Sequence, residues 1–181
     1  MTWQSLLRFW LLSVVLSLAN PLNALASDEW NQFKAAYIQD GRVIDRGQKD
    51  ISHSEGQGMG LLLAVHNNDR AAFAQIWNWT QHNLQVREDK LFAWSWSPTA
   101  GINDMNNASD GDLFIAWALS KAYTKWNEPR YLFAALQVSQ SIRAKLLRNT
   151  TKGLVLIPGA IGFEKPDYLK LNLSYWVFPA I

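Results

Sequence analysis

Apolar residues recur at spacings of three and four along most of the chain, which places them on one face of an α-helix. Almost no segment shows the period-two alternation that is typical of strands. Asn67, Asn68 and Asp69 are expected to cap the turn between two helices. We therefore expect an all-α fold of stacked helical hairpins. The predicted helices span residues 27–38, 55–67, 70–84, 110–126 and 130–147.

Two long connections interrupt the helical pattern. Residues 85–109 form an aromatic and polar stretch, and a connection of this length in a compact domain is usually functional. Residues 150–171 are expected to be irregular, with residues 154–163 (LVLIPGAIGF) as a buried loop or a short extended piece. No internal repeat of fixed period is present. We expect the long loops to gather at one end of the helices.

The first 26 residues have the pattern of a secretory leader. Arg8 precedes an apolar run of about ten residues, and Ala24-Leu25-Ala26 provides small residues for cleavage after Ala26. The apolar run is short for a membrane-spanning helix, so we expect export without stable membrane insertion; the alternative is an uncleaved anchor. The chain has no cysteine, which suits a periplasmic or secreted protein that needs no disulfide.

The charge balance excludes one class of partner. Arg8 is the only charged residue before Ser27, so residues 27–181 carry a net charge of only +1. This near-balance gives no electrostatic footprint for nucleic acid.

Tryptophan is abundant, with ten in the chain. Flat aromatic rings can stack on the C–H faces of sugar rings, and tryptophans in loops near acidic motifs are candidates for a sugar cleft. Plain core packing is the alternative for any single ring. The clusters are Trp77 with Trp79, then Phe92, Trp94 and Trp96, then Tyr175 with Trp176.

Two acidic motifs each precede an apolar helical run. Glu55 lies in SHSEGQGMG (52–60), and Asp110 and Asp112 lie in NNASDGDLF (106–114). A pair of carboxyl groups is what hydrolysis of a glycosidic bond requires. The alternative is structural: acids in the first turn of a helix are favoured by its dipole, and Ser109 or Asp110 could be an N-cap. We expect Asp112 to have this structural role.

Other chemistries fit the sequence less well. The acidic run before Leu113 does not match a calcium loop, because its twelfth position is Trp117 instead of glutamate. The three histidines lack the spacing of a zinc site, and no serine lies in a nucleophile elbow. His53 is close enough to Glu55 in sequence to tune it. We expect neither a metal nor a cofactor.

At these motifs the chain resembles glycoside hydrolase family eight, and within it the endoglucanases associated with bacterial cellulose synthesis. Residues 108–126 (ASDGDLFIAWALSKAYTKW) match the family signature around its aspartate, and residues 54–65 (SEGQGMGLLLAV) resemble the segment of its general acid. Further stretches agree in order and spacing. These are residues 30–45, 68–84, 156–163 and 172–176.

The resemblance implies an (α/α)6 barrel and endo-hydrolysis of β-1,4-glucan with inversion. It implies Glu55 as the proton donor and Asp110 as the signature aspartate, which would bind the sugar at the cleavage point. Tyr175 matches a cleft tyrosine, and Trp94 a stacking platform. Asp104 and Asn106 lie in the loop before Asp110 and could hydrogen-bond sugar or shape the loop.

Length is the main departure from the family. Its members run to roughly twice this length, so we expect residues 27–181 to be the N-terminal half of the barrel, marginally folded in isolation. The family's general base would then lie beyond Ile181. The partners expected are a β-glucan substrate and the cellulose synthase machinery. The alternatives are a non-catalytic glucan-binding or pseudogene product, and a helical-barrel lyase or a glycosidase acting on xylan or chitosan.

Overall fold

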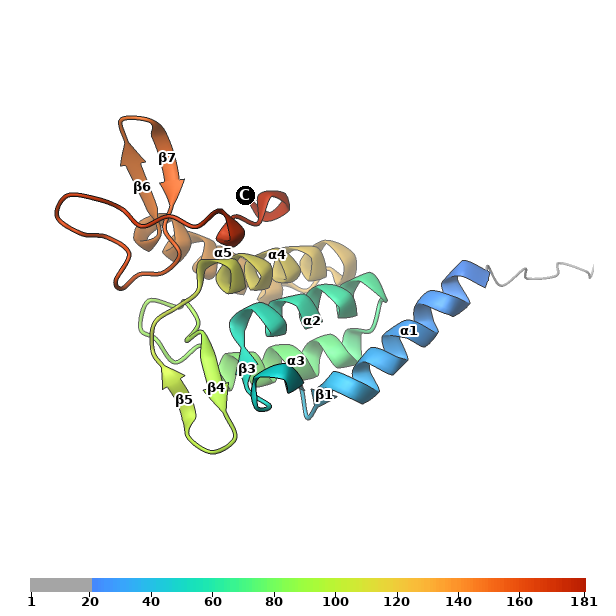
Figure 1. Cartoon of the computed structure of the whole chain (residues 1–181). Coiled ribbons are helices and arrows are strands. Elements are labelled where there is room, and N and C mark those ends of the chain that lie inside the picture. Colours follow the sequence, from blue (N-terminus) through green and yellow to red (C-terminus); the bar gives the residue numbers. More distant parts are fainter. Residues whose placement is uncertain (1–20) are drawn as a thin grey trace, which may run out of the picture.

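The computed structural model describes residues 21–181, in which five α-helices are joined by loops that carry short strands (Figure 1). The helices are α1 (Pro21–Tyr37), α2 (Ser54–His66), α3 (Arg70–Asn83), α4 (Ser109–Trp126) and α5 (Pro129–Lys145). The strands are β1 (Ile38–Gln39), β2 (Arg42–Val43), β3 (Ser52–His53), β4 (Ser95–Ser97), β5 (Gly101–Asp104), β6 (Leu147–Thr150) and β7 (Gly153–Leu156). Three 3-10 turns complete the set: η1 (Arg46–Gln48), η2 (Leu173–Tyr175) and η3 (Phe178–Ala180).

The helical predictions are confirmed for α2 to α5, whose ends lie within two residues of the expected positions. Asp69 caps α3, since its side chain accepts a hydrogen bond from the Ala72 backbone N–H at 2.9 Å. The first helix is helical from Pro21, the first described residue, and so extends further toward the N-terminus than the expected start at Ser27. Residues 1–20, which hold the apolar run of the expected leader, lie outside the described residues.

The expectation that residues 150–171 are irregular is wrong in part, and the long connection of residues 85–109 also carries strands. β4 and β5 pair within the first segment, and β3 joins them in a three-stranded antiparallel sheet. β6 begins at Leu147, the residue expected to end the last helix, and forms a hairpin with β7, which overlaps the stretch expected as a buried loop or a short extended piece. Strands of two to four residues are too short to show an alternating pattern, which explains why the sequence did not reveal them.

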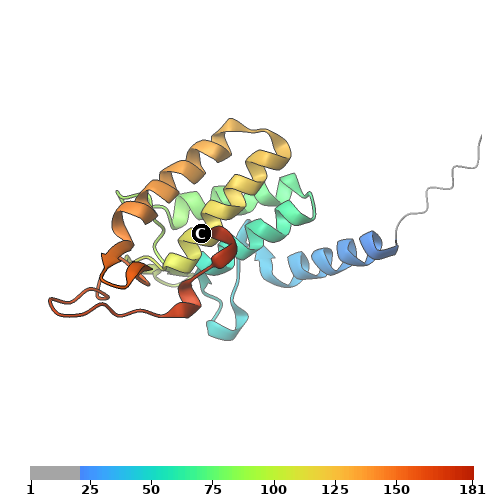
Figure 2. The same ribbon diagram turned by 90° about the horizontal axis from the view of Figure 1, so that it is seen from above.

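The helices stack as hairpins, as predicted. α2 packs against α3 and α4, and α4 packs against α5 (Figures 1 and 2). The C-terminal turns η2 and η3 lie against α4. Phe73 anchors the core, with the rings of Tyr131 and Trp126 edge-on to it at 4.9 and 5.1 Å between centroids.

Apolar surface is exposed on several elements. Met59 and Leu63 on α2 are about 40% exposed, and Leu173 and Phe178 near the C-terminal end are about 70% exposed. An apolar cavity lies between α4, α5, β7 and η3, beside Trp176. Marginal folding of residues 27–181 in isolation stays a prediction. No helix among residues 21–181 has the length and apolar character to cross a bilayer.

Candidate active site

Glu55 and Asp110 share one cleft, although 54 positions of sequence separate the two carboxylates. The cleft lies between the starts of α2 and α4 and has a cavity volume of about 150 Å³. Trp94 and Tyr175, both predicted to contact substrate, also line it, and the aromatic rings and carboxylates therefore meet as the sequence predicted. The remaining lining residues are Gln48, His53, Ser54 and Ala108.

The three-stranded sheet places Glu55 beside Trp94. In the register of β3 and β4, Ser52 lies opposite Trp96 and His53 opposite Ser95. The ladder continues by one hydrogen bond, from the Ser54 backbone N–H to the Trp94 carbonyl at 3.0 Å. Because α2 begins at Ser54, the first turn of the helix carries the Glu55 carboxylate into the cleft next to the indole.

Asp110 is delivered by the first turn of α4. The structure does not support the alternative of an N-cap from Ser109 or Asp110: the N-cap residue is Ala108, and no side chain caps the helix. The Ser109 backbone N–H instead donates to the Pro158 carbonyl at 2.9 Å, which ties the helix start to a distant loop. Asp110 Oδ1 accepts a hydrogen bond from the Gly111 backbone N–H at 2.7 Å. This contact orients the Asp110 carboxylate at the N-terminal end of α4.

Two glycines let α2 and α4 approach closely. A Cβ on Gly111 would overlap the Ser54 side chain and lie 2.8 Å from the Glu55 backbone nitrogen. A Cβ on Gly58 would lie 2.5 Å from Phe114 Cβ. Both distances are shorter than van der Waals contact, so neither position has room for a side chain. The separation of Glu55 and Asp110 is therefore set by contact between helix backbones.

The two carboxylates have different environments. Burial raises the pKa of Asp110, the Gly111 N–H opposes this, and the nearby charge of Glu55 raises it further. The Glu55 side chain is 41% exposed. Burial also raises the pKa of the Tyr175 phenol, and the charges of Asp110 and Glu55 add to this effect. The tyrosine therefore stays neutral and able to donate a hydrogen bond in the cleft.

Asp112 is structural, but as a buried acceptor and not as a surface acid of the first turn. Its side chain is fully buried and accepts hydrogen bonds from the Phe92 backbone N–H at 2.9 Å and from Asn107 Nδ2 at 2.6 Å. Asn107 Oδ1 in turn accepts from the Ala160 N–H at 2.7 Å. One carboxylate thus joins the Trp94 segment, the start of α4 and the loop after β7.

Asp104 and Asn106 do not line the cleft. Asp104 Oδ2 accepts from the Trp94 indole N–H at 3.0 Å, and its Oδ1 accepts from the Asn106 backbone N–H at 2.8 Å. These two bonds lower the pKa of Asp104. The Asn106 side chain bonds to both backbone groups of Ile161. Of the two roles left open by the sequence, the geometry favours shaping the loop.

Two residues near Glu55 were not singled out by the sequence as parts of a site. Gln48 lines the cleft from η1, and Asp45 lies behind it, bonded to the Gln48 side chain at 2.9 Å. Both belong to a loop without periodicity, so only their folded positions reveal them. Among residues 21–181, no three His, Cys, Asp or Glu side chains are grouped so as to hold a metal ion.

The comparisons with known proteins agree with this geometry. Residues 2–181 match the model of the glycosyl hydrolases family 8. The chain is 44% identical to an endoglucanase from Cellulomonas uda, over 87% of this chain and 45% of the relative. It is 40% identical to a probable endoglucanase from Novacetimonas hansenii, over 90% and 48%.

A solved structure extends the likeness to the fold. Endoglucanase Cel10, a family 8 glycosyl hydrolase from Klebsiella pneumoniae, superposes with a TM-score of 0.82 at 43% identity. The match covers 84% of this chain and 50% of that one. The helical hairpins are therefore those of an (α/α)6 barrel. The chain spans about half the length of the curated relatives it matches.

Proposed function

The chain belongs to the glycosyl hydrolases family 8, and from that membership we propose that it serves endo-hydrolysis of β-1,4-glucan with inversion at the anomeric carbon. The observation that supports this most directly is the convergence of Glu55 and Asp110 in one cleft with Trp94 and Tyr175. Carboxylates provide the acid–base chemistry, and flat rings provide apolar faces for glucose units.

In this mechanism Glu55 donates its proton to the oxygen of the leaving sugar. Asp110, oriented by the Gly111 N–H, accepts hydrogen bonds from the sugar at the cleavage point. Trp94 carries a neighbouring glucose ring, with its indole held by Asp104.

Inversion also needs an ionised carboxylate that activates water on the opposite face of the sugar. We propose that this base comes from the part of the family fold that the match does not cover. The intact mass of the mature protein tests this directly. A mass near that of residues 27–181 would favour the alternative of a non-catalytic glucan-binding or pseudogene product.

Glu55→Gln tests the assignment of the proton donor. On cello-oligosaccharides, whose leaving group needs protonation, loss of a general acid lowers kcat by roughly 10²–10⁴-fold. On a dinitrophenyl β-cello-oligosaccharide, whose leaving group departs without a proton, the variant should keep most of its activity. The matched control is Glu88→Gln, at an exposed position outside the cleft. Equal losses on both substrates would contradict the role of Glu55.

Product analysis tests the reaction class. Inversion predicts that NMR first detects the α-anomer at the new reducing end. Release of unsaturated sugars would indicate a lyase, and faster turnover of xylan or chitosan would favour those substrates over glucan.

We also propose that the protein is exported and acts in the periplasm or outside the cell, beside the cellulose synthase machinery. The leader pattern of residues 1–26 supports export. N-terminal sequencing of the mature protein should begin at Ser27. A chain that retains Arg8 would instead indicate an uncleaved anchor.

A further inference from the structure

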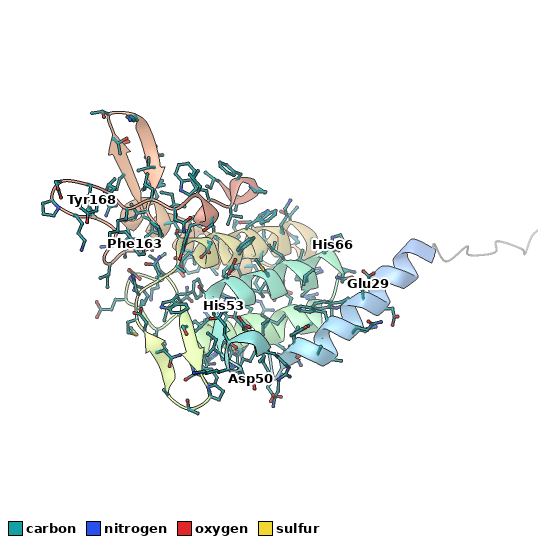
Figure 3. All side chains as sticks on the ribbon, in the orientation of Figure 1. Glu29, Asp50, His53, His66, Phe163 and Tyr168 are labelled. Atoms are coloured by element: carbon teal, nitrogen blue, oxygen red, sulfur yellow. The ribbon has the colours of Figure 1, made fainter. Side chains whose placement is uncertain are left out.

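His53 is the residue that precedes α2 (labelled in Figure 3), and it lies between the carboxylates of Asp45 and Glu55. Its Nδ1 accepts a hydrogen bond from the Gly56 backbone N–H at 3.0 Å and lies 4.0 Å from Glu55 Oε2. Its Nε2 lies 3.3 Å from Asp45 Oδ2. The ring therefore caps the helix on one side and faces a carboxylate on the other.

These contacts fix the position of the imidazole proton. Nδ1 accepts from Gly56, so it carries no hydrogen, and a neutral ring must then carry its proton on Nε2. Asp45 is the acceptor for that proton. The tautomer next to Glu55 is thus the one whose near nitrogen has no N–H to offer.

Asp45 is held as an acceptor by four N–H groups. Its Oδ1 accepts from the backbone of Gly47 and Gln48 at 2.9 and 3.1 Å, and its Oδ2 accepts from the Gln48 side chain and His53. Burial alone raises the pKa of Asp45, but these hydrogen bonds outweigh burial, so the pKa is lowered overall. The group stays ionised at neutral pH.

We propose that Asp45 is a positioning residue that locks His53 as the Nε2–H tautomer and so keeps the Glu55 carboxyl free to carry a transferable proton. In the other tautomer, Nδ1–H would face the Gly56 N–H, and its positive N–H dipole would lie about 4.0 Å from Glu55 Oε2. A positive dipole at that distance favours the carboxylate form of Glu55 over the carboxyl form that the reaction uses. The inference rests on the proposed role of Glu55 as proton donor.

Asp45→Asn reverses the tautomer by simple hydrogen-bond accounting. The asparagine oxygen is needed by the two backbone N–H groups of Gly47 and Gln48, so its NH₂ turns toward His53. Nε2 must then become the acceptor of that NH₂ group, and the ring proton moves to Nδ1. The Gly56 N–H then loses Nδ1 as its acceptor. Charge alone does not explain this change. The matched control is therefore Asp50→Asn, an exposed carboxylate of the same loop that pairs with Arg46 and not with His53 (Figure 3).

The other charged groups around His53 are few, and they lie on different secondary-structure elements. Glu55 lies on α2, the charge of Asp110 on α4 is felt through the cleft, and Arg46 lines the groove on the other side of the ring. Each of these stays in place in Asp45→Asn, which changes the group bonded to Nε2, its charge and its bond to the Gln48 side chain. Asp50→Asn controls for the loss of a charge from the same loop.

The first test is the tautomer itself, read at neutral pH by long-range ¹H–¹⁵N NMR of the protein labelled at histidine. The chain has only three histidines, and His53→Asn, which preserves a favourable N-cap residue, assigns the His53 signal. The expected result is Nε2–H in the wild type and in Asp50→Asn, and Nδ1–H in Asp45→Asn. Nδ1–H or a doubly protonated ring in the wild type, or no change in Asp45→Asn, would overturn the proposal.

The second test is the dependence on leaving group. Asp45→Asn should lower kcat on cello-oligosaccharides by roughly 10²-fold, as expected for a disabled general acid, with a far smaller loss on the dinitrophenyl substrate. Equal losses on both substrates would mean that Asp45 only supports the fold. If the wild type hydrolyses neither substrate, the proposed function fails, and the NMR result still decides whether Asp45 sets the tautomer.

Discussion

Asp112 should make the stability of the protein fall as the pH rises. Its carboxyl is fully buried, and burial raises its pKa from an ordinary value of 3.8 to about 7, against the hydrogen bonds from Phe92 and Asn107. The folded state therefore binds the proton more tightly than the unfolded state. Stability from this group is fully present below about pH 4 and is lost as the pH approaches 7.

The size of this effect follows from the shift in pKa. Each pKa unit corresponds to about 1.4 kcal/mol, so the group contributes up to about 4 kcal/mol between pH 4 and pH 8, an order-of-magnitude figure. Asp112→Asn removes the titrating group at nearly constant shape. We expect the stability of the variant relative to the wild type to rise by a few kcal/mol across this range.

The assay is urea unfolding followed by tryptophan fluorescence at a series of pH values. Subtracting the wild type from the variant removes the contribution of every other titrating group. The control is Asp167→Asn, at an exposed position, for which the difference should stay near zero at every pH. A constant difference between Asp112→Asn and the wild type from pH 4 to pH 8 would refute the reasoning.

The same substitution should cost activity even where it adds stability. Asparagine cannot accept from both the Phe92 N–H and Asn107 Nδ2, so one donor is left unpaired, at about 1–3 kcal/mol. That loss loosens the segment that carries Trp94. Unchanged kcat and KM on cello-oligosaccharides would show that the buried network does not hold the cleft.

Two further variants test how the cleft is held. Gly111→Ala should destabilise the protein by about 1–3 kcal/mol and lower kcat strongly, because the added methyl group forces α4 away from Ser54 and Glu55; normal thermal unfolding and kcat would contradict this. Asp104→Ala should raise KM about fivefold with little change in kcat, because the Trp94 indole N–H loses a hydrogen bond of about 1 kcal/mol. An unchanged KM would show that the position of Trp94 does not depend on Asp104.

Helices α3, α4 and α5 could be predicted from the sequence because a period of 3.6 residues, repeated over 14 or more positions, is a strong signal. The sheet could not. β3 has two residues and β4 has three, and their partnership depends on bringing residue 52 beside residue 96. That contact forms only when the helices pack, so no local pattern marks it.

The candidate site divides in the same way. Glu55 and Asp110 could be named because each lies in an acidic motif before a helix, whereas the cleft roles of Trp94 and Tyr175 came from the resemblance to the family. Asp45 ends the family-like stretch 30–45, but nothing along the chain marks its role. Its importance lies in the atoms it reaches, and a loop that turns through η1 to bring a carboxylate to His53 has no periodicity to read.

The packing of α2 against α4 explains why the two kinds of residue behave differently under mutation. The distance between Glu55 and Asp110 depends on the close contact of α2 and α4 at Gly58 and Gly111, so it changes only when the two helices are forced apart there. In our proposal the proton on Glu55 depends instead on the tautomer of His53, whose Nδ1 lies 4.0 Å from Glu55 Oε2 and whose Nε2 is bonded to Asp45. Spacing and protonation are therefore set by separate parts of the structure. It follows that Gly111→Ala should impair substrates with good and poor leaving groups alike, whereas Asp45→Asn should impair only those that need the acid.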